Sequence, residues 1–232
     1  MLRAVRFAAF FGFVLEEATR DAIVRMAHLV TSVSPERIAA ELRAMVSRPG
    51  RQRALELLEQ TGLAREVLPE LAPPGGGVWR EMTRVVGALD EPDLPTALAL
   101  LAGDLPTLAL RGVASRLRLS ARELKTAVWL HEAAAFFEAG GEPAVRPWSE
   151  VQPWLADQRA PLLADLLRAR AACGLGDPAA AAWVSGQVIR PRPELDPPAL
   201  VTGHDLDALG VPEGRVVGEL LAALRALQLD GV

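Results

Sequence analysis

The sequence predicts an all-α fold built from many short helices. Three observations indicate this. No long run alternates apolar and polar residues as a half-buried strand would, tyrosine is absent, and apolar residues recur at helical spacing between helix start and stop signals. No fixed-period repeat runs along the chain, so a regular solenoid is not indicated.

The composition narrows the class of protein. The chain has 232 residues, of which 50% are hydrophobic and 23% charged, with a formal net charge of −4. This length supports one or two domains with a sizeable core, and the hydrophobic content excludes a disordered chain. No uncharged apolar stretch reaches the roughly 18 residues of a membrane span, and no signal peptide is evident, so we expect a cytoplasmic protein.

The charge balance is mildly acidic, whereas a strongly basic domain would suggest nucleic acid. Basic residues need only cluster locally to follow a phosphate backbone, however. Almost all of the cations are arginines, and Lys125 is the only lysine. Together with the heavy use of Ala, Leu and Gly, this bias is also typical of a GC-rich genome.

The N-terminal part of the sequence predicts four helices. The first covers Leu2–Phe11 and ends at Gly12, and the second covers Glu16–Leu29. The motif Ser34-Pro35-Glu36 opens a third helix that runs to about Val46: Ser caps the free N–H groups, Pro suits the first helical position, and Glu complements the helix dipole. A fourth helix covers Arg51–Gln60 and stops at Gly62.

The segment Ala72–Gly77 is the clearest linker, because its two prolines and three glycines cannot continue a helix. Beyond it we predict helices over Val78–Leu89, Thr96–Ala102 and Thr107–Leu117. Ser120 and Glu123 form a capping box for a helix that runs to Ala139.

Asp177-Pro178 opens a further helix that ends near Ile189. The four prolines of Arg190–Pro198 indicate a second linker. The tail, Thr202–Gly231, predicts a short helix and a longer one separated at Gly210.

Most catalytic chemistry lacks the residues it needs. The three histidines, His28, His131 and His204, are far apart and have no metal-ligand spacing, so packing or surface roles are favoured. Cys173 is the only cysteine, which excludes an intramolecular disulfide and a Cys-based zinc site. No basic neighbour is spaced to activate its thiol. We therefore expect no catalytic residue and no metal site in this chain.

Three segments, in order along the chain, resemble one enzyme family. They are Met1-Leu2-Arg3-Ala4-Val5-Arg6-Phe7-Ala8-Ala9 with Gly12-Phe13 and Leu15-Glu16; Ser34-Pro35-Glu36-Arg37-Ile38 with Glu41-Leu42; and Gly203-His204-Asp205-Leu206 with Leu209-Gly210, Gly214, Gly218, Leu220-Leu221 and Gln228-Leu229-Asp230-Gly231. These segments resemble the neck and tail of class II tRNA nucleotidyltransferases, the CCA-adding enzymes and their bacterial poly(A) polymerase relatives. They bracket nearly the whole chain.

The resemblance implies an all-helical array of neck (1–71), body (78–190) and tail (199–232) that grips the acceptor arm and elbow of tRNA. In the family, a separate N-terminal head carries out nucleotidyl transfer with paired Asp residues that hold metal ions. Neither that head nor the family's base-reading Glu-Asp-x-x-Arg motif is present in this sequence. We therefore expect that this chain does not transfer nucleotides alone. Mg²⁺ and CTP or ATP are expected only with the missing head, which is encoded upstream or has been removed.

The resemblance also suggests site residues. Arg3 and Arg6 would lie near the nucleotide and the RNA 3′ end, although pairing with Glu16 or Glu17 is an alternative. The RNA-binding candidates are Arg43, Arg48, Arg51, Arg53, Gly214 and Gly218. An exposed charged loop explains those arginines as well, and close helix packing explains the glycines. The residues expected to hold the neck together are Ser34, Glu36, Arg37 and Glu41.

Several alternatives stay open. Some relatives carry a His-Asp phosphohydrolase motif where this chain has Gly103-Asp104, and the missing His argues against that activity. The expected partners are tRNA and the N-terminal catalytic head, with the oligomeric state unspecified. A rival from another class is a helical protein-interaction module that has lost RNA binding. A truncated reading frame is a third alternative, which predicts an exposed apolar surface where the head would pack.

Overall fold

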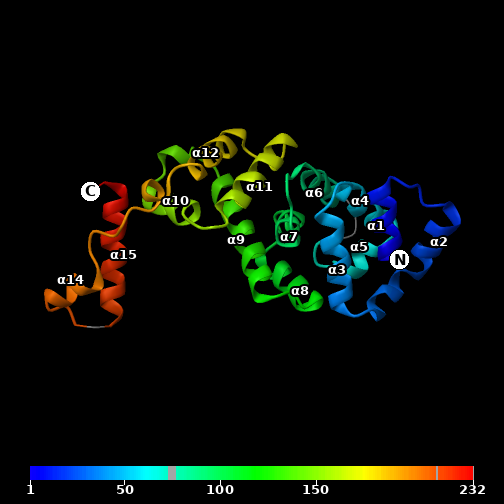
Figure 1. Ribbon diagram of the computed structural model, residues 1–232, viewed down its shortest axis with the longest axis horizontal. Helices are drawn as coiled ribbons and strands as arrows, with labels where there is room; N and C mark the ends of the chain where they lie inside the picture. The colour runs from blue at the N-terminus through cyan, green and yellow to red at the C-terminus, as the bar shows by residue number, and fades with distance from the viewer. Residues whose placement is uncertain (73–76, 213, 232) are drawn as a thin grey trace.

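The computed structural model describes residues 1–72, 77–212 and 214–231, and every regular element in these ranges is helical. The predicted all-α fold is therefore confirmed for the described residues. The helices form an elongated arch, with the N-terminal helices at one end and the last helix hanging from the other (Figure 1). None of the described helices has the length and apolar character needed to cross a membrane.

The N-terminal helices are α1 (Leu2–Phe11), α2 (Glu17–Met26), the 3₁₀ helix η1 (Ala27–Ser32), α3 (Pro35–Val46), α4 (Arg51–Gln60) and α5 (Leu63–Val67). Helices α1 and α4 have the predicted bounds, whereas α5 was not predicted. The second helix ends earlier than predicted and tightens into η1. There the hydroxyls of Thr31 and Ser32 donate to carbonyls three residues back, at 2.9 and 2.7 Å, which competes with the α-helical pattern.

The start of α3 differs from the prediction at one side chain. Pro35 occupies the first turn and Glu36 adds the acidic charge there, as predicted, but the Ser34 side chain makes no capping hydrogen bond. Ser34 still occupies the N-cap position, with φ −58° and ψ 140°, but its hydroxyl accepts from none of the free backbone N–H groups of the first turn. The predicted Ser34 cap is therefore wrong.

The central helices are α6 (Gly77–Ala88), α7 (Leu94–Ala102), α8 (Thr107–Leu117), α9 (Ala121–Glu138), the 3₁₀ turn η2 (Pro143–Val145), α10 (Trp148–Leu155), α11 (Ala160–Ala172) and α12 (Pro178–Val188). The Ser120–Glu123 capping box is confirmed. Helix α7 starts two residues before the prediction, because Asp93 accepts from the backbone N–H of Thr96 at 2.9 Å. Helices α10 and α11 lie in a stretch for which the sequence predicts no element.

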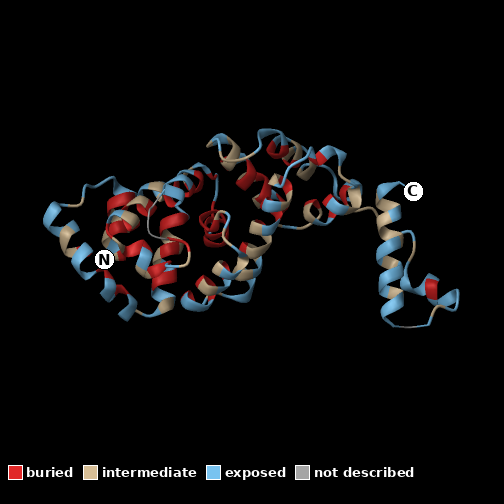
Figure 2. Ribbon diagram, turned by 180° about the vertical axis from the view of Figure 1, so that it is seen from behind, coloured by how far each residue is buried: buried red, intermediate tan, exposed pale blue. Residues whose placement is uncertain are grey.

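One hydrophobic core extends through the neck and body helices, from Leu2 to Leu195. All nine residues of α7 are buried, so this helix forms the centre of the arch. Across the predicted linker, of which residues 73–76 lie outside the described ranges, the indole Nε1 of Trp79 donates to the carbonyl of Leu55 at 3.3 Å. Figure 2 shows that the buried residues are concentrated in the neck and body helices.

The C-terminal segment is far less buried. The predicted linker Arg190–Pro198 contains the one-turn helix α13 (Arg192–Leu195), whose Leu195 is buried. Beyond it lie α14 (Gly203–Ala208) and α15 (Arg215–Asp230), and no described residue of α15 is buried (Figure 2). The C-terminal end of α15 is attached to the body, since the Asp230 carboxylate accepts from the backbone N–H and the hydroxyl of Ser149, both at 2.8 Å.

Replacing Gly50 with Ala is expected to lower the free energy of unfolding by about 2 kcal/mol or more. Gly50 has φ +84°, and a Cβ there would lie 2.6 Å from the carbonyl oxygen of Ala9. Gly12 has a similar φ of +70° with no atom within 4 Å of its Cβ position, so Gly12→Ala is a matched control for backbone strain alone. Urea unfolding measures both. Equal losses of unfolding free energy in the two variants would show that the close approach of the Gly50 turn to α1 contributes nothing to the effect of Gly50→Ala.

Candidate nucleic-acid interface

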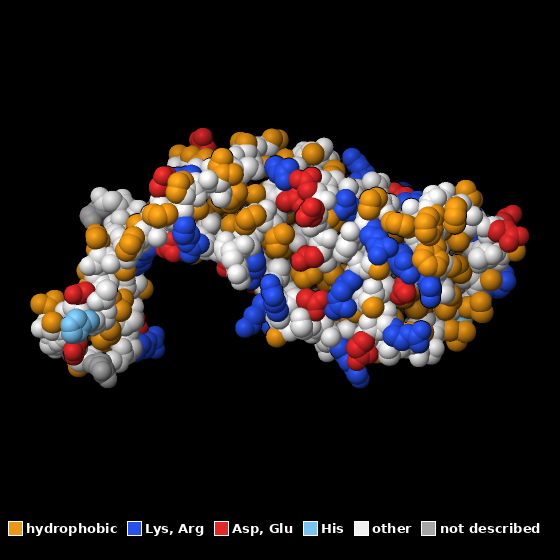
Figure 3. All heavy atoms as spheres, viewed as in Figure 1, with side chains coloured by type: hydrophobic (Ala, Val, Ile, Leu, Met, Phe, Trp, Pro, Cys, Tyr) orange, Lys and Arg blue, Asp and Glu red, His pale blue; other side chains and the backbone are white. Residues whose placement is uncertain are grey.

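A cleft of about 710 Å³, named here the α9 cleft, lies where the C-terminal end of α3 meets α7, α9 and α11. Its basic side chains are Arg43 from α3, Arg122 and Lys125 from α9, and Arg159 just before α11. Arg122 and Lys125 are exposed and share one face of α9, because they are three residues apart. Figure 3 shows Lys and Arg side chains gathered along the concave edge of the arch over α8 and α9.

Two of these cations are held in place by acidic partners. Arg43 Nη2 lies 2.7 Å from Glu123 Oε1, which joins α3 to α9, and Arg159 Nη2 lies 2.6 Å from Asp157 Oδ2. The Arg159 guanidinium also lies over the Trp129 ring, 4.5 Å from its centroid. These contacts fix the positions of the two guanidiniums at the wall of the cleft.

The carboxylates in these pairs stay ionised to unusually low pH. Burial opposes ionisation of Glu123, but hydrogen bonds from Ser120 and Arg43 outweigh it, so the pKa of Glu123 lies below its usual value. A hydrogen bond from Arg159 lowers the pKa of Asp157 in the same way. Within the described ranges, Arg122 and Lys125 have no ion-pair partner, so the charge available to an anion in this cleft comes from α9.

The predicted basic stretch lies beside the end of α1. Arg51 and Arg53 line a second hollow, of about 500 Å³, together with Pro49 and Gly50. Arg53 is paired only loosely, with Nη1 at 3.7 Å from Glu56 Oε2. The structure thus brings two of the predicted arginines together, while Arg43 turns toward the α9 cleft.

Arg48 and the two predicted arginines of α1 contact aromatic rings. The Arg48 guanidinium lies over Phe10 at 5.3 Å, and those of Arg3 and Arg6 lie over Phe7 at 5.1 and 4.5 Å. Arg6 Nε also lies 2.7 Å from Glu41 Oε2, so its partner is Glu41 rather than Glu16 or Glu17. Arg3 is exposed and forms no ion pair among the described residues.

The residues expected to hold the neck together have different roles in the structure. Glu41 joins α3 to α1 through Arg6, and Glu36 Oε1 lies 2.8 Å from Arg118 Nη1 at the end of α8. The pKa of Glu36 lies below its usual value because its carboxylate interacts with its own backbone N–H and with Arg118. Arg37 is exposed, with no ion pair in the described ranges.

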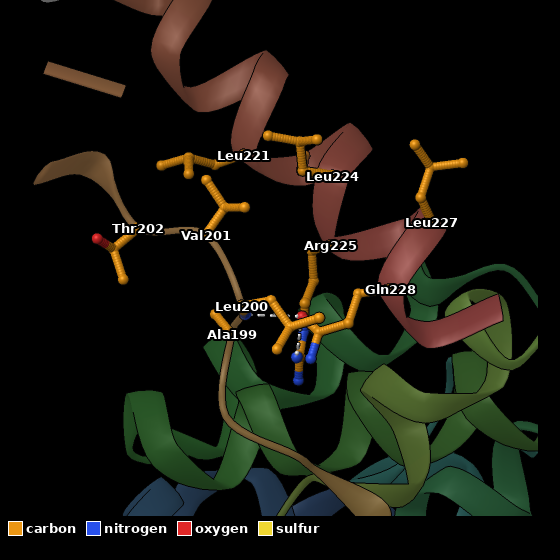
Figure 4. A pocket seen from close by; sticks show the side chains of 10 residues that line it. Ala199, Leu200, Val201, Thr202, Leu221, Leu224, Arg225, Leu227 and Gln228 are labelled. Atoms are coloured by element: carbon orange, nitrogen blue, oxygen red, sulfur yellow. Dashed lines mark hydrogen bonds between the residues drawn. The ribbon is translucent and has the colours of Figure 1, made fainter. Parts of the chain in front are cut away.

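The tail differs from the basic cleft because it carries an apolar groove and more acidic than basic residues. An apolar groove of about 660 Å³ lies between residues 199–202 and α15, where Val201 lies near Leu221 and Leu200 lies beside Gln228 (Figure 4). Residues 199–232 contain two arginines against five acidic residues. Such a surface is poorly suited to binding a phosphate backbone.

The two predicted tail glycines lie at the free end of α15. Gly214 precedes the first residue of the helix and has φ +147°, and Gly218 lies one turn further on. A Cβ at either position would meet no atom within 4 Å among the described residues. Close helix packing therefore does not account for these glycines in this structure.

The histidines and the cysteine lie in separate places. Among the described residues, no group of three or more His, Cys, Asp or Glu side chains is arranged to hold a metal ion. One juxtaposition is not visible in the sequence: His131 lines a small cavity with Gly103, Asp104 and Glu138. The cavity is only about 40 Å³, and the Glu138 carboxylate in it is paired with Arg170 at 2.8 Å.

The chain is similar in sequence and in fold to several known proteins. A family model described as the probable RNA- and SrmB-binding site of polymerase A matches residues 12–73. The chain is 44% identical over 72 residues to the CCA-adding enzyme of Geobacillus stearothermophilus, which is 31% of this chain and 18% of that relative. Its fold is similar to the crystal structure of the Bacillus stearothermophilus CCA-adding enzyme in complex with CTP, with a TM-score of 0.70 and 27% identity over 100% of this chain.

The chain is thus similar to CCA-adding enzymes in sequence over 72 residues and in fold over its whole length. The resemblance found in the sequence is thereby confirmed. The chain spans 56% of the solved CCA-adding enzyme from Bacillus stearothermophilus. The Thermotoga maritima CCA-adding enzyme complexed with tRNA also shares the fold, with a TM-score of 0.61 at 17% identity.

Sequence reasoning missed part of the cleft. Arg122 and Lys125 could have been identified, since the capping box places both in the first turns of one helix at a spacing of three. Arg159 gave no comparable signal, because its place in the cleft depends on the packing of α11 against α9.

Proposed function

We propose that this chain is the tRNA-binding helical part of a CCA-adding-type tRNA nucleotidyltransferase, with a role in tRNA 3′-end processing. The observation that carries this proposal is the cleft in which Arg122 and Lys125 present unpaired charge beside the fixed Arg43 and Arg159. The match of residues 12–73 to an RNA-binding family and the shared fold of a tRNA-bound CCA-adding enzyme support it.

The proposed recognition is by shape and phosphate contacts. An A-form acceptor arm presents a deep, narrow major groove that side chains cannot read, so contacts to phosphates and 2′-hydroxyls are the available ones. A concave, helical surface with basic side chains along its edge suits such a duplex (Figure 3).

The chemistry of nucleotide addition is proposed to lie on an N-terminal catalytic head, the second partner of this chain. Mg²⁺ and CTP or ATP are proposed to bind on that head, since paired carboxylates that hold metal ions are what nucleotidyl transfer uses. We propose a cytoplasmic location, as tRNA processing requires.

The decisive measurement is the affinity of the purified chain for a tRNA lacking its 3′ CCA, by fluorescence anisotropy across a salt series. Two phosphate contacts, from Arg122 and Lys125, predict a loss of about 12-fold in affinity between about 50 and 200 mM salt, because bound counterions are released on binding. Duplex DNA of equal length is the control and should bind more weakly.

A rival function is a helical protein-interaction module that has lost RNA binding. The acidic net charge of −4 is the observation that favours it. A folded, soluble chain that fails to bind tRNA at low salt, or that binds DNA equally well, would contradict the tRNA proposal.

A further inference from the structure

The N-terminal end of the arch carries an exposed aromatic cluster, formed by Phe7, Phe10, Phe11 and Phe13. Ring centroids lie 5.9 Å apart for Phe7 and Phe11, 4.8 Å for Phe10 and Phe11, and 5.4 Å for Phe11 and Phe13. Phe10, Phe11 and Phe13 are 39%, 56% and 63% exposed. Burying such rings is normally favourable, so a surface of this kind indicates a binding partner.

Cations surround this aromatic cluster. The guanidiniums of Arg3, Arg6 and Arg48 lie over its Phe7 and Phe10 rings. Figure 3 shows hydrophobic side chains gathered at the N-terminal end with Lys and Arg side chains beside them. Arg6 is paired with Glu41 at 2.7 Å, so the positive charge at the cluster that has no ion-pair partner among the described residues comes from Arg3 and Arg48.

The packing of α1 on α4 also places the basic hollow next to the cluster. The Gly50 turn touches the backbone of Ala9, so Arg51 and Arg53 lie close to the end of α1. Exposed rings with arginines stacked on them and further arginines beside them are the combination that binds unpaired nucleic acid, with bases on the rings and phosphates on the cations.

We infer that the Phe10–Phe11–Phe13 platform binds unpaired RNA nucleotides by base stacking, with Arg3, Arg48, Arg51 and Arg53 contacting the strand's phosphates. This inference rests on the proposed RNA-binding function and adds a second site to it. The α9 cleft takes duplex backbone, whereas the platform takes a strand whose bases are free to stack.

The test compares two RNA hairpins, one blunt and one with a four-nucleotide unpaired extension that contains 2-aminopurine. In the unmodified chain, the extension should raise affinity about tenfold, because base–aromatic stacking strengthens binding by that order. Its 2-aminopurine fluorescence should be quenched on binding.

Replacing both rings by Leu, as Phe11→Leu with Phe13→Leu, keeps the surface apolar but removes the stacking faces. This variant should lose both the tenfold gain and the quenching, while Phe11→Trp with Phe13→Trp should keep them. Leu29→Ala, at an exposed apolar residue of η1, is the control for lost apolar surface alone and should keep them.

The outcomes separate the two sites. If the extension gives no gain in the unmodified chain, or if the leucine variant keeps the gain, the platform is overturned and the rings are a protein-docking surface. If the blunt hairpin does not bind while a free single-stranded oligonucleotide still does in a Phe-dependent way, the duplex proposal fails and the platform stands.

Discussion

Replacing Arg170 with Leu is expected to lower the free energy of unfolding by about 3 kcal/mol at neutral pH. Arg170 Nε lies 2.8 Å from Glu138 Oε1, and the two side chains are only 15% and 17% exposed. Arg170 also donates to the carbonyl of Leu175 at 3.1 Å, which holds the turn that leads to α12. Without the guanidinium, the Glu138 carboxylate stays largely shielded from water with no counter-charge.

The loss of unfolding free energy in the Arg170→Leu variant should become smaller as the pH falls. Burial raises the pKa of Glu138 above its usual value, although Arg170 opposes this. A carboxyl group with a raised pKa binds its proton more readily in the folded state, so stability is gained as the pH falls toward the usual value of the group. Removing Arg170 raises the pKa of Glu138 further, so the deficit of the variant should shrink between pH 7 and about 4.5.

Urea unfolding of the two proteins at a series of pH values measures this deficit. The matched control is the double variant Glu138→Gln with Arg170→Leu, which has no buried carboxylate and should recover part of the loss. A deficit that stays constant with pH, and that the double variant does not reduce, would attribute the loss to the Leu175 contact alone.

Reversing the two free charges of α9, Arg122→Glu with Lys125→Glu, should weaken tRNA binding about 30-fold at low salt. Each substitution removes an attraction to phosphate and adds a repulsion in the cleft. The slope of log affinity against log salt should become shallower by about two, one for each contact that is lost.

A matched variant tests whether the position of these charges matters. Arg65→Glu with Arg84→Glu changes the net charge by the same amount at two exposed arginines outside the cleft. Equal losses in the two variants would show that tRNA binding follows overall charge rather than the α9 cleft. Circular dichroism should show that both variants remain helical.

Much of the fold could be predicted from local signals. Gly12 ended α1 correctly because a left-handed residue stops a helix there, and the Ser120–Glu123 capping box fixed the start of α9. Helix α11 was missed because its buried positions lie on more than one face and leave no clear apolar stripe for a periodicity argument to detect. The sequence motif placed Ser34 correctly at the N-cap position of α3, but it could not show that the side chain would make no capping hydrogen bond there.

The candidate interface could be predicted only in part. Motif resemblance predicted RNA-binding roles for the neck arginines, but it could not show which cations are already paired. Arg6 and Arg43 are bound to Glu41 and Glu123, from segments 35 and 80 residues away, and such pairs form only when the helices pack. The four phenylalanines of the aromatic cluster are close together in the sequence, whereas the contact of Arg48 with Phe10 depends on the turn at Gly50 reaching α1.

The attachment of α15 has a mechanical consequence for the whole arch. Its C-terminal end is fastened by Asp230 and Arg225 to Ser149 and Asp196, while its N-terminal end projects away from the body (Figure 1). Because no described residue of α15 is buried, a rotation of this helix away from the body would break its polar contacts without exposing a hydrophobic core. The angle between α15 and the body can therefore change while the hydrophobic core of the neck and body helices stays intact.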